Sequence, residues 1–301
     1  MTTDPIPQPG SPEWKAIRAT GLGGSEAAAA CGLSRYQTPL HIYSRKRGLL
    51  AEIDDNDAMR MGRRLEPIVI AEFVDRTGEE IAAAPVATGR HEKHGCILAT
   101  PDAQLVSGSL LECKTTTWRT AAELGDEGSD YIPVEWLMQC QQQLAVFKMD
   151  LCHLAVLLDG RTLRTYKVER NDVLIGRMLV MELELWERIE QGRAPEPDFK
   201  HEATYDLIRA IHKVETGKTI DLGPDLVQVW QRDRKLAKIE TKVEKLRKEL
   251  RAQVLHGMGD AAIARLPGGE KEVVRKSIDA TLVEAYTKKS YVTLTERKVK
   301  E

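Results

Sequence analysis

The chain has 301 residues, of which 42% are hydrophobic and 30% are charged, with a formal net charge of −2; this composition is typical of a globular protein with one large domain and an appendage, or with two domains. It contains no run of eighteen apolar residues, and its start, MTTDPIPQPGSP, lacks the charged-then-apolar order of a secretory signal, so we expect a cytoplasmic protein without a membrane span. Its five cysteines are scattered without C-x-x-C spacing, which argues against a zinc site, an iron–sulfur cluster or a disulfide framework.

Charge is distributed unevenly along the chain. From Lys200 to Glu301 there are 22 Lys and Arg residues against 16 Asp and Glu residues, a balance of +6, so the first 199 residues carry −8. An acidic body with a basic tail is compatible with metal chemistry in the first part and contact with a polyanion in the second. The asymmetry alone does not establish nucleic-acid binding.

A glycine-rich turn between two predicted helices is the first candidate binding site along the chain. Ser11-Pro12 has the form of an N-cap followed by proline at the first helical position, and it predicts a short helix through Arg18 that ends at Gly21. The segment GLGGSEAAAACG then predicts a flexible turn with Ser25 as the N-cap of a small-residue helix. Backbone amides at this helix start, the Ser25 hydroxyl and Arg18 together suit a phosphate group, although a tight helix–helix turn is the simpler interpretation.

Glu66 lies at an irregular place in the helical segments that follow. Thr38-Pro39 repeats the cap signature before one helix, and a longer pattern with one broad apolar face runs from about Asp57 to Arg76. Pro67 falls inside this pattern, where a proline removes a hydrogen bond and usually marks a kink or a new helical start. Glu66, directly before it, is either a solvent-facing carboxylate or a third member of an acidic site formed farther along the chain.

The segment LATPDAQLVSGSLLECKTTT carries the strongest functional signal. Because side chains two apart on a strand share a face, Glu112 and Lys114 point the same way and Cys113 points opposite. Ser107-Gly108-Ser109 predicts a hairpin turn that returns Asp102 toward the same end. The strand-like runs of this region predict a meander at residues 80–86, 95–99, 103–106 and 110–116.

Two carboxylates and one ammonium would therefore converge at one end of this hairpin. Carboxylates in that arrangement prefer a hard divalent cation such as Mg²⁺, and an adjacent ammonium can orient an attacking water or help to deprotonate it. Hydrolysis of a phosphodiester is the chemistry that best uses the set. From the spacing alone, an ordinary Glu–Lys pair on the exposed face of an amphipathic hairpin is an equally good interpretation.

A helix and two further strands complete a predicted mixed sheet. Pro133 starts the amphipathic helix VEWLMQCQQQLAVF, on which Gln139 lies near the boundary of the apolar face, where a glutamine is usually only polar surface. CHLAVLLD and TLRTYKVE predict strands, and a helix from about Asp172 to Gln191 closes the domain before the linker-like GRAPEPD. We therefore expect an α/β (α+β) fold with a central mixed sheet flanked by helices.

Residues 200–301 differ in character from the rest of the chain. Over DRKLAKIETKVEKLRKELRA, apolar residues follow the 3-4 spacing of a short coiled coil or a helical hairpin. AAIARL-PGG-EKEVVRK then predicts a β-hairpin with a Pro-Gly-Gly turn. Because this part holds no catalytic grouping, we expect it to contact a protein partner or DNA.

Five separated pieces of the chain together resemble the YqaJ-like viral recombinase family, which includes the phage lambda exonuclease. They are the turn from Arg18 to Ser25, MGRRLEP around Glu66, TPDA around Asp102, LECK ending at Lys114, and QCQQQLAV beginning at Gln139. The resemblance covers roughly residues 12–195; each piece alone is weak, but their order and gaps are specific. It implies a PD-(D/E)xK, restriction-endonuclease-like fold for a nuclease domain at 1–199, with a basic extension at 200–301.

The activity that the resemblance implies is digestion of one strand of linear duplex DNA in the 5′→3′ direction, which leaves 3′ single-stranded overhangs for phage-type homologous recombination. The cofactor would be Mg²⁺, with Mn²⁺ as a substitute. Asp102 and Glu112 would bind the metal, with Glu66 and the backbone carbonyl of Cys113 as further ligands. Lys114 would act on the attacking water.

Four other positions take their roles from the same resemblance. Gln139 matches the family glutamine that helps to position the lysine or the nucleophile. Arg18 and Ser25 match the family pocket for a terminal 5′-phosphate, and Arg119 is a looser match as another phosphate contact.

Two departures from the family pattern qualify this assignment. Ala103 stands where a glycine usually follows the motif aspartate, and the phage lambda enzyme lacks the region beyond residue 200. The resemblance further implies a homo-oligomer, a ring-shaped trimer, encoded by a phage or prophage and acting in the bacterial cytoplasm. A single-strand annealing protein is the partner that we expect for the extension.

Two other functions stay open. A structure-specific or single-strand nuclease of the same fold is favoured if Arg18 and Ser25 form only a helix turn. A non-catalytic, DNA-binding recombination adaptor is the alternative from a different class. A competent residue at every chemical position argues against the adaptor.

Overall fold

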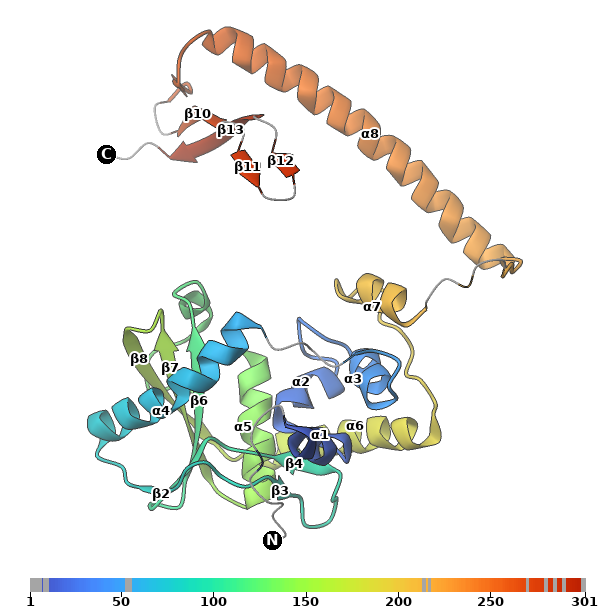
Figure 1. Ribbon diagram of the computed structural model, residues 1–301. Coiled ribbons are helices and arrows are strands. Elements are labelled where there is room, and N and C mark those ends of the chain that lie inside the picture. The colour runs from blue at the N-terminus through green and yellow to red at the C-terminus, as the bar shows by residue number, and fades with distance from the viewer. Residues whose placement is uncertain are drawn as a thin grey trace. The chain divides into compact units, whose positions relative to one another are not determined.

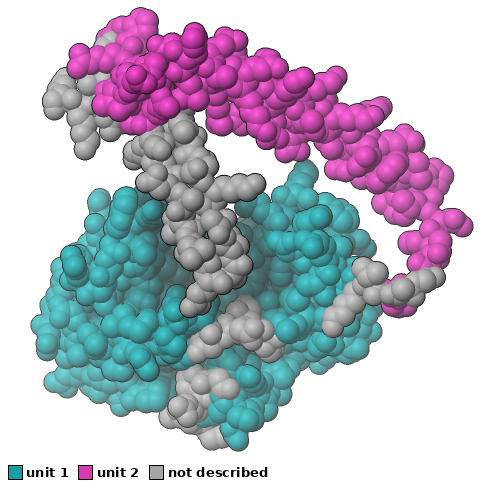
Figure 2. Space-filling view, turned by 45° about the horizontal axis from the view of Figure 1, so that its top comes forward, with its two compact units in different colours: residues 1–214 teal, residues 215–301 magenta. Residues whose placement is uncertain are grey.

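The computed structural model describes residues 7, 11–51, 56–212, 215, 218–268, 271–278, 281–283, 286–288 and 291–298, and after residue 275 it describes the backbone alone. The chain divides into two compact units, residues 1–214 and 215–301, which Figure 2 colours separately. Most of the leader before Ser11 and the Gly269 end of the predicted Pro-Gly-Gly turn lie outside the described residues. Among the described helices, none combines the length and the apolar character needed to cross a membrane.

A five-stranded mixed sheet forms the centre of the first unit (Figure 1). Its strands, in spatial order, are β2 (Ile81–Ala83), β5 (Ala103–Leu105), β6 (Leu110–Thr116), β7 (Leu151–Leu158) and β8 (Thr162–Glu169). Neighbouring strands are antiparallel except β6 and β7, which run parallel because the chain returns through helix α5 (Val134–Phe147). The predicted central mixed sheet is confirmed.

Helices cover both faces of this sheet (Figure 1). Helix α4 (Asp57–Thr77) contributes Phe73 to an apolar cluster with Leu111 of β6, and α5 contributes Leu144 to another cluster with Leu110. Fully burying each side chain of this kind stabilises the fold by roughly 1.5–3 kcal/mol. Because neighbouring residues of β6 face opposite ways, its even-numbered side chains point toward α5.

The predicted four-strand meander is wrong in one respect, because residues 97–99 leave the central sheet. Strand β4 (Ile97–Ala99) lies between β1 (Leu22–Gly23) and β3 (Gly89–Arg90) in a separate three-stranded sheet. β4 pairs with β1 in parallel, and the Leu22 N–H donates to the Cys96 carbonyl at 2.7 Å. This pairing joins segments about seventy residues apart, so the local pattern around residue 97 did not predict it.

The remaining elements of the first unit are α1 (Pro12–Ala19), η1 (Gly24–Glu26), α2 (Ala27–Ala30), α3 (Pro39–Lys46), η2 (Thr120–Glu123), α6 (Asp172–Gln191) and α7 (Thr204–Ile211). The predicted caps at Ser11 and Thr38 are confirmed, and α4 continues through Pro67. Helix α7 buries Leu207 in the core of this unit, which therefore extends to residue 214. The functional division into residues 1–199 and 200–301 stays a prediction.

The second unit consists of one long helix followed by short strands. Helix α8 (Pro224–Met258) is 35 residues long and contains the whole predicted helical segment. One sheet has the order β13 (Tyr291–Lys298), β10 (Lys271–Ile278) and β9 (Ile263–Arg265), and β11 (Thr281–Val283) pairs with β12 (Tyr286–Lys288). β9 and β10 are antiparallel, so the predicted β-hairpin is confirmed.

Glu182 on α6 is a carboxyl group enclosed in the core of the first unit. It is 1% exposed, and its Oε1 atom has no hydrogen-bond partner among the described residues. Burial, and then the nearby Glu26 carboxylate, raises the pKa of Glu182 to about 8. The folded chain therefore keeps a proton at neutral pH that an unfolded chain would release.

We expect Glu182→Gln to flatten the dependence of stability on pH. The raised pKa makes Glu182 favour the folded state at acidic pH, and this contribution is lost as the pH rises from the ordinary Glu value toward 8. The variant should reduce the loss of unfolding free energy between pH 5 and pH 8 by roughly 3 kcal/mol, measured by urea denaturation. Glu184→Gln, on the exposed side of the same helix, is the control. An unchanged pH slope in Glu182→Gln would show that the group titrates normally.

Candidate active site

The β5–β6 hairpin brings Asp102 beside the strand that carries Glu112. Ala103 pairs with Leu111, and the Asp102 N–H donates to the Leu111 carbonyl at 3.1 Å. The Cys113 N–H donates in turn to Asp102 Oδ2 at 2.6 Å. The hairpin therefore returns Asp102 toward Glu112 as its turn residues predicted.

Glu112, Lys114 and Gln139 form one hydrogen-bonded cluster between β6 and α5. Lys114 Nζ donates to Glu112 Oε1 at 2.6 Å and to Gln139 Oε1 at 2.9 Å. Gln139 Nε2 donates to Glu112 Oε1 at 2.6 Å. Glu112 is only 3% exposed, so it is not part of an ordinary surface ion pair, and Gln139 is not merely polar surface.

Gln143 completes this cluster, although the sequence did not single it out. Its Nε2 donates to Glu112 Oε2 at 2.6 Å, and the side chain is 1% exposed. Both carboxylate oxygens of Glu112 are thus bound by side chains of this chain. Gln143 lies one helical turn after Gln139, so the Q-x-x-x-Q spacing on α5 was the signal that could have found it.

Negative charge exceeds positive charge in this cluster. Burial, followed by the Glu112 and Glu66 carboxylates, raises the pKa of Asp102 well above its usual value. Burial and Glu112 also raise the pKa of Glu66, although Lys114 acts in the opposite direction. Burial alone would lower the pKa of Lys114, but the Glu112 and Asp102 carboxylates outweigh it and raise that pKa.

This excess of carboxylate oxygens fits a hard divalent cation. The Glu112 carboxylate lies close enough to Glu66 and Asp102 to help raise the pKa of both, and a cation would compensate the charge of the three groups. Oxygen donors of this kind favour Mg²⁺ or Mn²⁺. Within the described residues, no three Asp, Glu, His or Cys side chains already stand as a metal-binding group; both Glu112 oxygens are engaged by Lys114 and two glutamines instead.

Arg18 and Ser25 lie together in the glycine-rich turn, but Ser25 does not cap a helix. Both terminal nitrogens of Arg18 donate to Ser25 Oγ at 3.4 Å, and the guanidinium lies over the Trp14 ring at 4.9 Å. The predicted N-cap role of Ser25 is wrong because Ser25 lies inside η1. The Glu26 carboxylate reaches back instead and accepts from the Gly23 N–H at 2.9 Å.

Glu26 and Lys46 hold Arg18 in place through ion pairs and a hydrogen bond, and neither residue was predicted from the sequence. Glu26 Oε2 lies 3.3 Å from Arg18 and 3.1 Å from Lys46 Nζ, which also donates to the Arg18 carbonyl at 2.7 Å. Burial raises the pKa of Glu26, but Arg18 and Lys46 outweigh burial and hold it below its usual value. No local signal connects Lys46 with Arg18, because they lie 28 residues apart on different helices.

One pocket of about 480 Å³ connects the two groups. From the acidic cluster and the helix beside it, the pocket is lined by Glu66, Asp102, Gln139 and Gln143. From α1 and the glycine-rich turn, it is lined by Arg18, Gly23, Gly24 and Ser25. Arg119 is not among the lining residues; it is exposed at the start of η2. The pocket thus combines carboxylates suited to a cation with a guanidinium and a hydroxyl suited to an anion.

Comparison with known sequences finds relatives over most of the chain. Residues 13–150 match the YqaJ-like viral recombinase domain. The chain is 31% identical over 275 residues to the uncharacterized protein YqaJ of Bacillus subtilis (strain 168), a match that covers 89% of this chain and 85% of that protein. Because the first unit holds 214 of the 301 residues, this relative also shares part of the second unit.

Comparison with solved structures finds the same fold in exonucleases. The alkaline exonuclease LHK-Exo from Laribacter hongkongensis matches with a TM-score of 0.51 and 21% identity, over 61% of this chain and 94% of that chain. The structure of LHK-Exo in complex with dAMP matches with the same values. The predicted restriction-endonuclease-like fold is therefore confirmed.

We expect Glu26→Gln to destabilise the first unit, because the change leaves the buried Lys46 ammonium without its carboxylate. Breaking one side of a buried ion pair costs about 3 kcal/mol, which should appear as a lower melting temperature at pH 7. Since the pKa of Glu26 is depressed, its contribution is present near neutral pH and is lost as the pH falls through the acidic range.

The control for this variant is Glu92→Gln. Glu92 pairs with Lys148 at the surface, where both side chains are more than half exposed, and its loss should leave the melting temperature unchanged. Equal effects of the two substitutions would contradict a supporting role for Glu26.

Proposed function

We propose that this chain, which belongs to the YqaJ-like viral recombinase family, is a metal-dependent deoxyribonuclease that digests linear duplex DNA from its ends. The family and the exonuclease-like fold support a nuclease role in recombination. The finer proposal is that it removes one strand in the 5′→3′ direction and leaves 3′ overhangs for homologous recombination.

One observation carries this proposal: two carboxylates of the acidic cluster line the same pocket as a pair of side chains suited to an anion. Asp102 and Glu66 share the pocket with Arg18 and Ser25. A generic phosphodiesterase needs only the first pair, whereas an enzyme that starts at a DNA end gains from holding the terminal phosphate in register with the scissile bond. The proximity of the two pairs therefore favours an end-directed nuclease over a single-strand or structure-specific one.

Asp102, Glu112 and Glu66, with the Cys113 carbonyl, are the groups that we propose as ligands of Mg²⁺ or Mn²⁺. Such an ion, when bound, polarises the phosphoryl group and lowers the pKa of an attacking water. Gln139 and Gln143 fix the Glu112 side chain, since each donates to one of its carboxylate oxygens. A ligand that is already oriented loses less conformational entropy when it binds a cation.

Lys114 acts, in this proposal, as a positioned ammonium beside the reacting phosphate. Its raised pKa keeps the proton on Nζ at neutral pH, so it donates hydrogen bonds to the phosphate or the attacking water. Its present partners, Glu112 Oε1 and Gln139 Oε1, fix the direction of the side chain. An ammonium held in this way stabilises negative charge that grows in the transition state.

Arg18 and Ser25 would bind the 5′-phosphate of the strand being digested. Arg18 is one-third exposed and is held by Glu26, so its guanidinium is oriented while it stays accessible. An arginine and a hydroxyl can together make several charge-assisted hydrogen bonds to one phosphate.

The function is tested by digestion of end-labelled DNA in the presence of Mg²⁺. We expect a linear duplex with 5′-phosphates to be digested about tenfold faster or more than the same duplex with 5′-hydroxyls, because the phosphate adds charge-assisted hydrogen bonds. Closed circular DNA should stay intact, and chelation of the metal should stop digestion. Efficient cutting of circles, or equal rates on both ends, would exclude the end-directed activity.

Lys114→Ala tests the assigned centre. We expect digestion to fall by about 10²–10³-fold while affinity for duplex DNA stays within a few-fold, because the ammonium acts mainly on charge that develops in the transition state. Lys93→Ala, a surface lysine away from this pocket, is the control. An active Lys114→Ala variant would contradict the assignment, and loss of DNA binding by both variants would indicate a general charge effect.

A further inference from the structure

Helix α8 exposes an apolar seam that no part of its own unit covers within the described residues. Along its 35 residues only Met258 is buried. Five aliphatic side chains in its middle are between 50% and 63% exposed: Leu236, Ile239, Val243, Leu246 and Leu250. Most helices of this kind gain their stability from packing of an apolar face, so this seam is suited to a partner.

The spacing of the seam indicates that the partner is another helix. The five residues follow 3-4-3-4 spacing, an average period of 3.5, which keeps a narrow stripe on one side of a helix. A helix that packs on a sheet or a globular core usually shows a wider face. Among the described residues of 215–301, α8 is the only helix, so the second helix has to come from elsewhere.

We infer that the seam of α8 pairs with α8 of a second copy of this chain, in antiparallel orientation. If residues 236, 243 and 250 are first core positions and 239 and 246 are second core positions, a two-fold axis near Thr241 pairs four of these five residues and places Leu250 opposite Arg232 of the second copy. Leu236 then faces Leu246 of the second copy, and Ile239 faces Val243 of the second copy. The two central layers recur on the other side of the axis by symmetry.

Charges beside the seam support this orientation. In the antiparallel register, Lys235 lies beside Glu249 of the second copy, and Asp233 lies beside Arg247 of the second copy. Symmetry gives each pairing twice, so four contacts join opposite charges. Charges that flank a coiled-coil core set the partner and the orientation of its helices.

The favourable contacts outnumber the unfavourable ones only in the antiparallel pair. The antiparallel register places Lys242 beside Lys242 of the second copy, and Glu240 beside Glu240 of the second copy. These are two contacts between like charges. A parallel pair would join Lys235 to Glu240 twice, but it would also join Lys242 to Arg247 twice, so attraction and repulsion would cancel. The balance of charge therefore favours antiparallel pairing.

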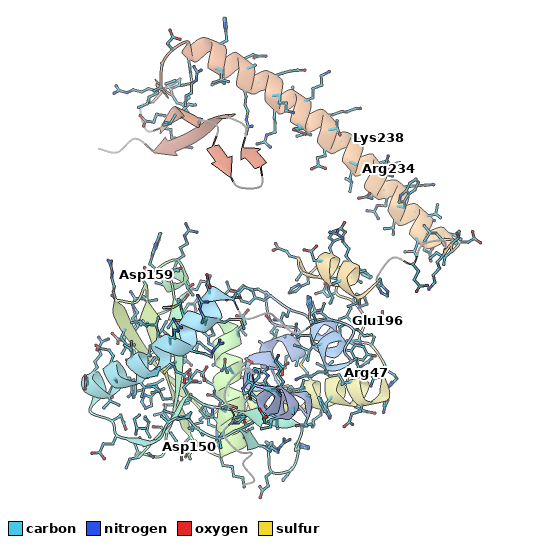
Figure 3. All side chains as sticks on the ribbon, in the orientation of Figure 1. Arg47, Asp150, Asp159, Glu196, Arg234 and Lys238 are labelled. Carbon is cyan, nitrogen blue, oxygen red and sulfur yellow. The ribbon has the colours of Figure 1, made fainter. Side chains whose placement is uncertain are left out.

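The opposite side of α8 has a different character and would stay free in such a pair. Five cations lie on that side, Arg234, Lys238, Lys245, Lys248 and Arg251, together with Glu244, which pairs with Lys248 at 3.0 Å. Figure 3 shows Arg234 and Lys238 along the helix. A polyanion such as DNA would contact this basic side rather than the aliphatic seam.

The test compares the full-length chain with two variants by sedimentation equilibrium. Val243→Asp puts a charge into the seam, and Thr241→Asp puts the same charge on the opposite side of the same helix. We expect Val243→Asp to weaken association by about tenfold or more, because a buried charge has to be desolvated, and Thr241→Asp to leave it unchanged. Circular dichroism checks that both variants keep the helix.

A charge exchange tests the orientation. Lys235→Glu and Glu249→Lys should each weaken association, and the double variant should restore it, because the two residues face each other only in the antiparallel pair. All the substitutions lie in α8, so any association through residues 1–214 is the same in every variant. Differences in association between the variants therefore measure the contribution of α8 alone.

Four outcomes would overturn the inference. A wild-type chain that stays monomeric, or equal association of Val243→Asp and Thr241→Asp, would show that the seam does not join copies. Failure of the double exchange to restore association would exclude the antiparallel register. Loss of duplex-DNA affinity in Val243→Asp with unchanged association would show that the seam contacts DNA.

Discussion

The buried carboxylate of Glu112 is the point on which the geometry of this site depends. A charged group that is 3% exposed is costly unless its oxygens are bonded, and here Lys114, Gln139 and Gln143 supply those bonds. The donors come from the same strand and from the helix that connects it to the next parallel strand. Satisfying one carboxylate therefore fixes the distance and rotation of α5 relative to the sheet.

A second buried carboxylate does similar work in the glycine-rich turn. Glu26 joins Arg18 on α1 to Lys46 on α3 and also binds the Gly23 N–H within the turn. One pocket is lined both by Arg18, which pairs with Glu26, and by Gln139, which binds Glu112. Gly24 also packs against Gln139 of α5. Arg18 and Ser25 are thus held in a fixed relation to the acidic cluster by packing as well as by charge.

The two compact units obtain their stability by different means. The first encloses its sheet between helices, and the central carboxylates of its polar clusters, Glu26 and Glu112, are buried. The second has a helix that is exposed along nearly its whole length, so in a single copy of the chain its apolar seam faces water. A second copy that covers this seam would give α8 the packing that α4 and α5 obtain from the sheet.

The sequence by itself determined the local elements and the residue types of the site. Helix caps, the β5–β6 turn and the alternation of Glu112, Cys113 and Lys114 depend on short-range geometry, which a local pattern records. Only the tertiary structure decided that β4 pairs with β1 instead of the central sheet, and that Glu26 rather than Ser25 binds the turn. It also decided that Gln143 binds Glu112 and that Lys46 binds Glu26. The pairing of β4 with β1 and the contacts of Gln143 and Lys46 join residues 20 to 75 positions apart, which a local pattern does not record. In the turn, several polar groups are neighbours, and which of them binds the backbone depends on which group lacks a hydrogen-bond partner when the layers pack.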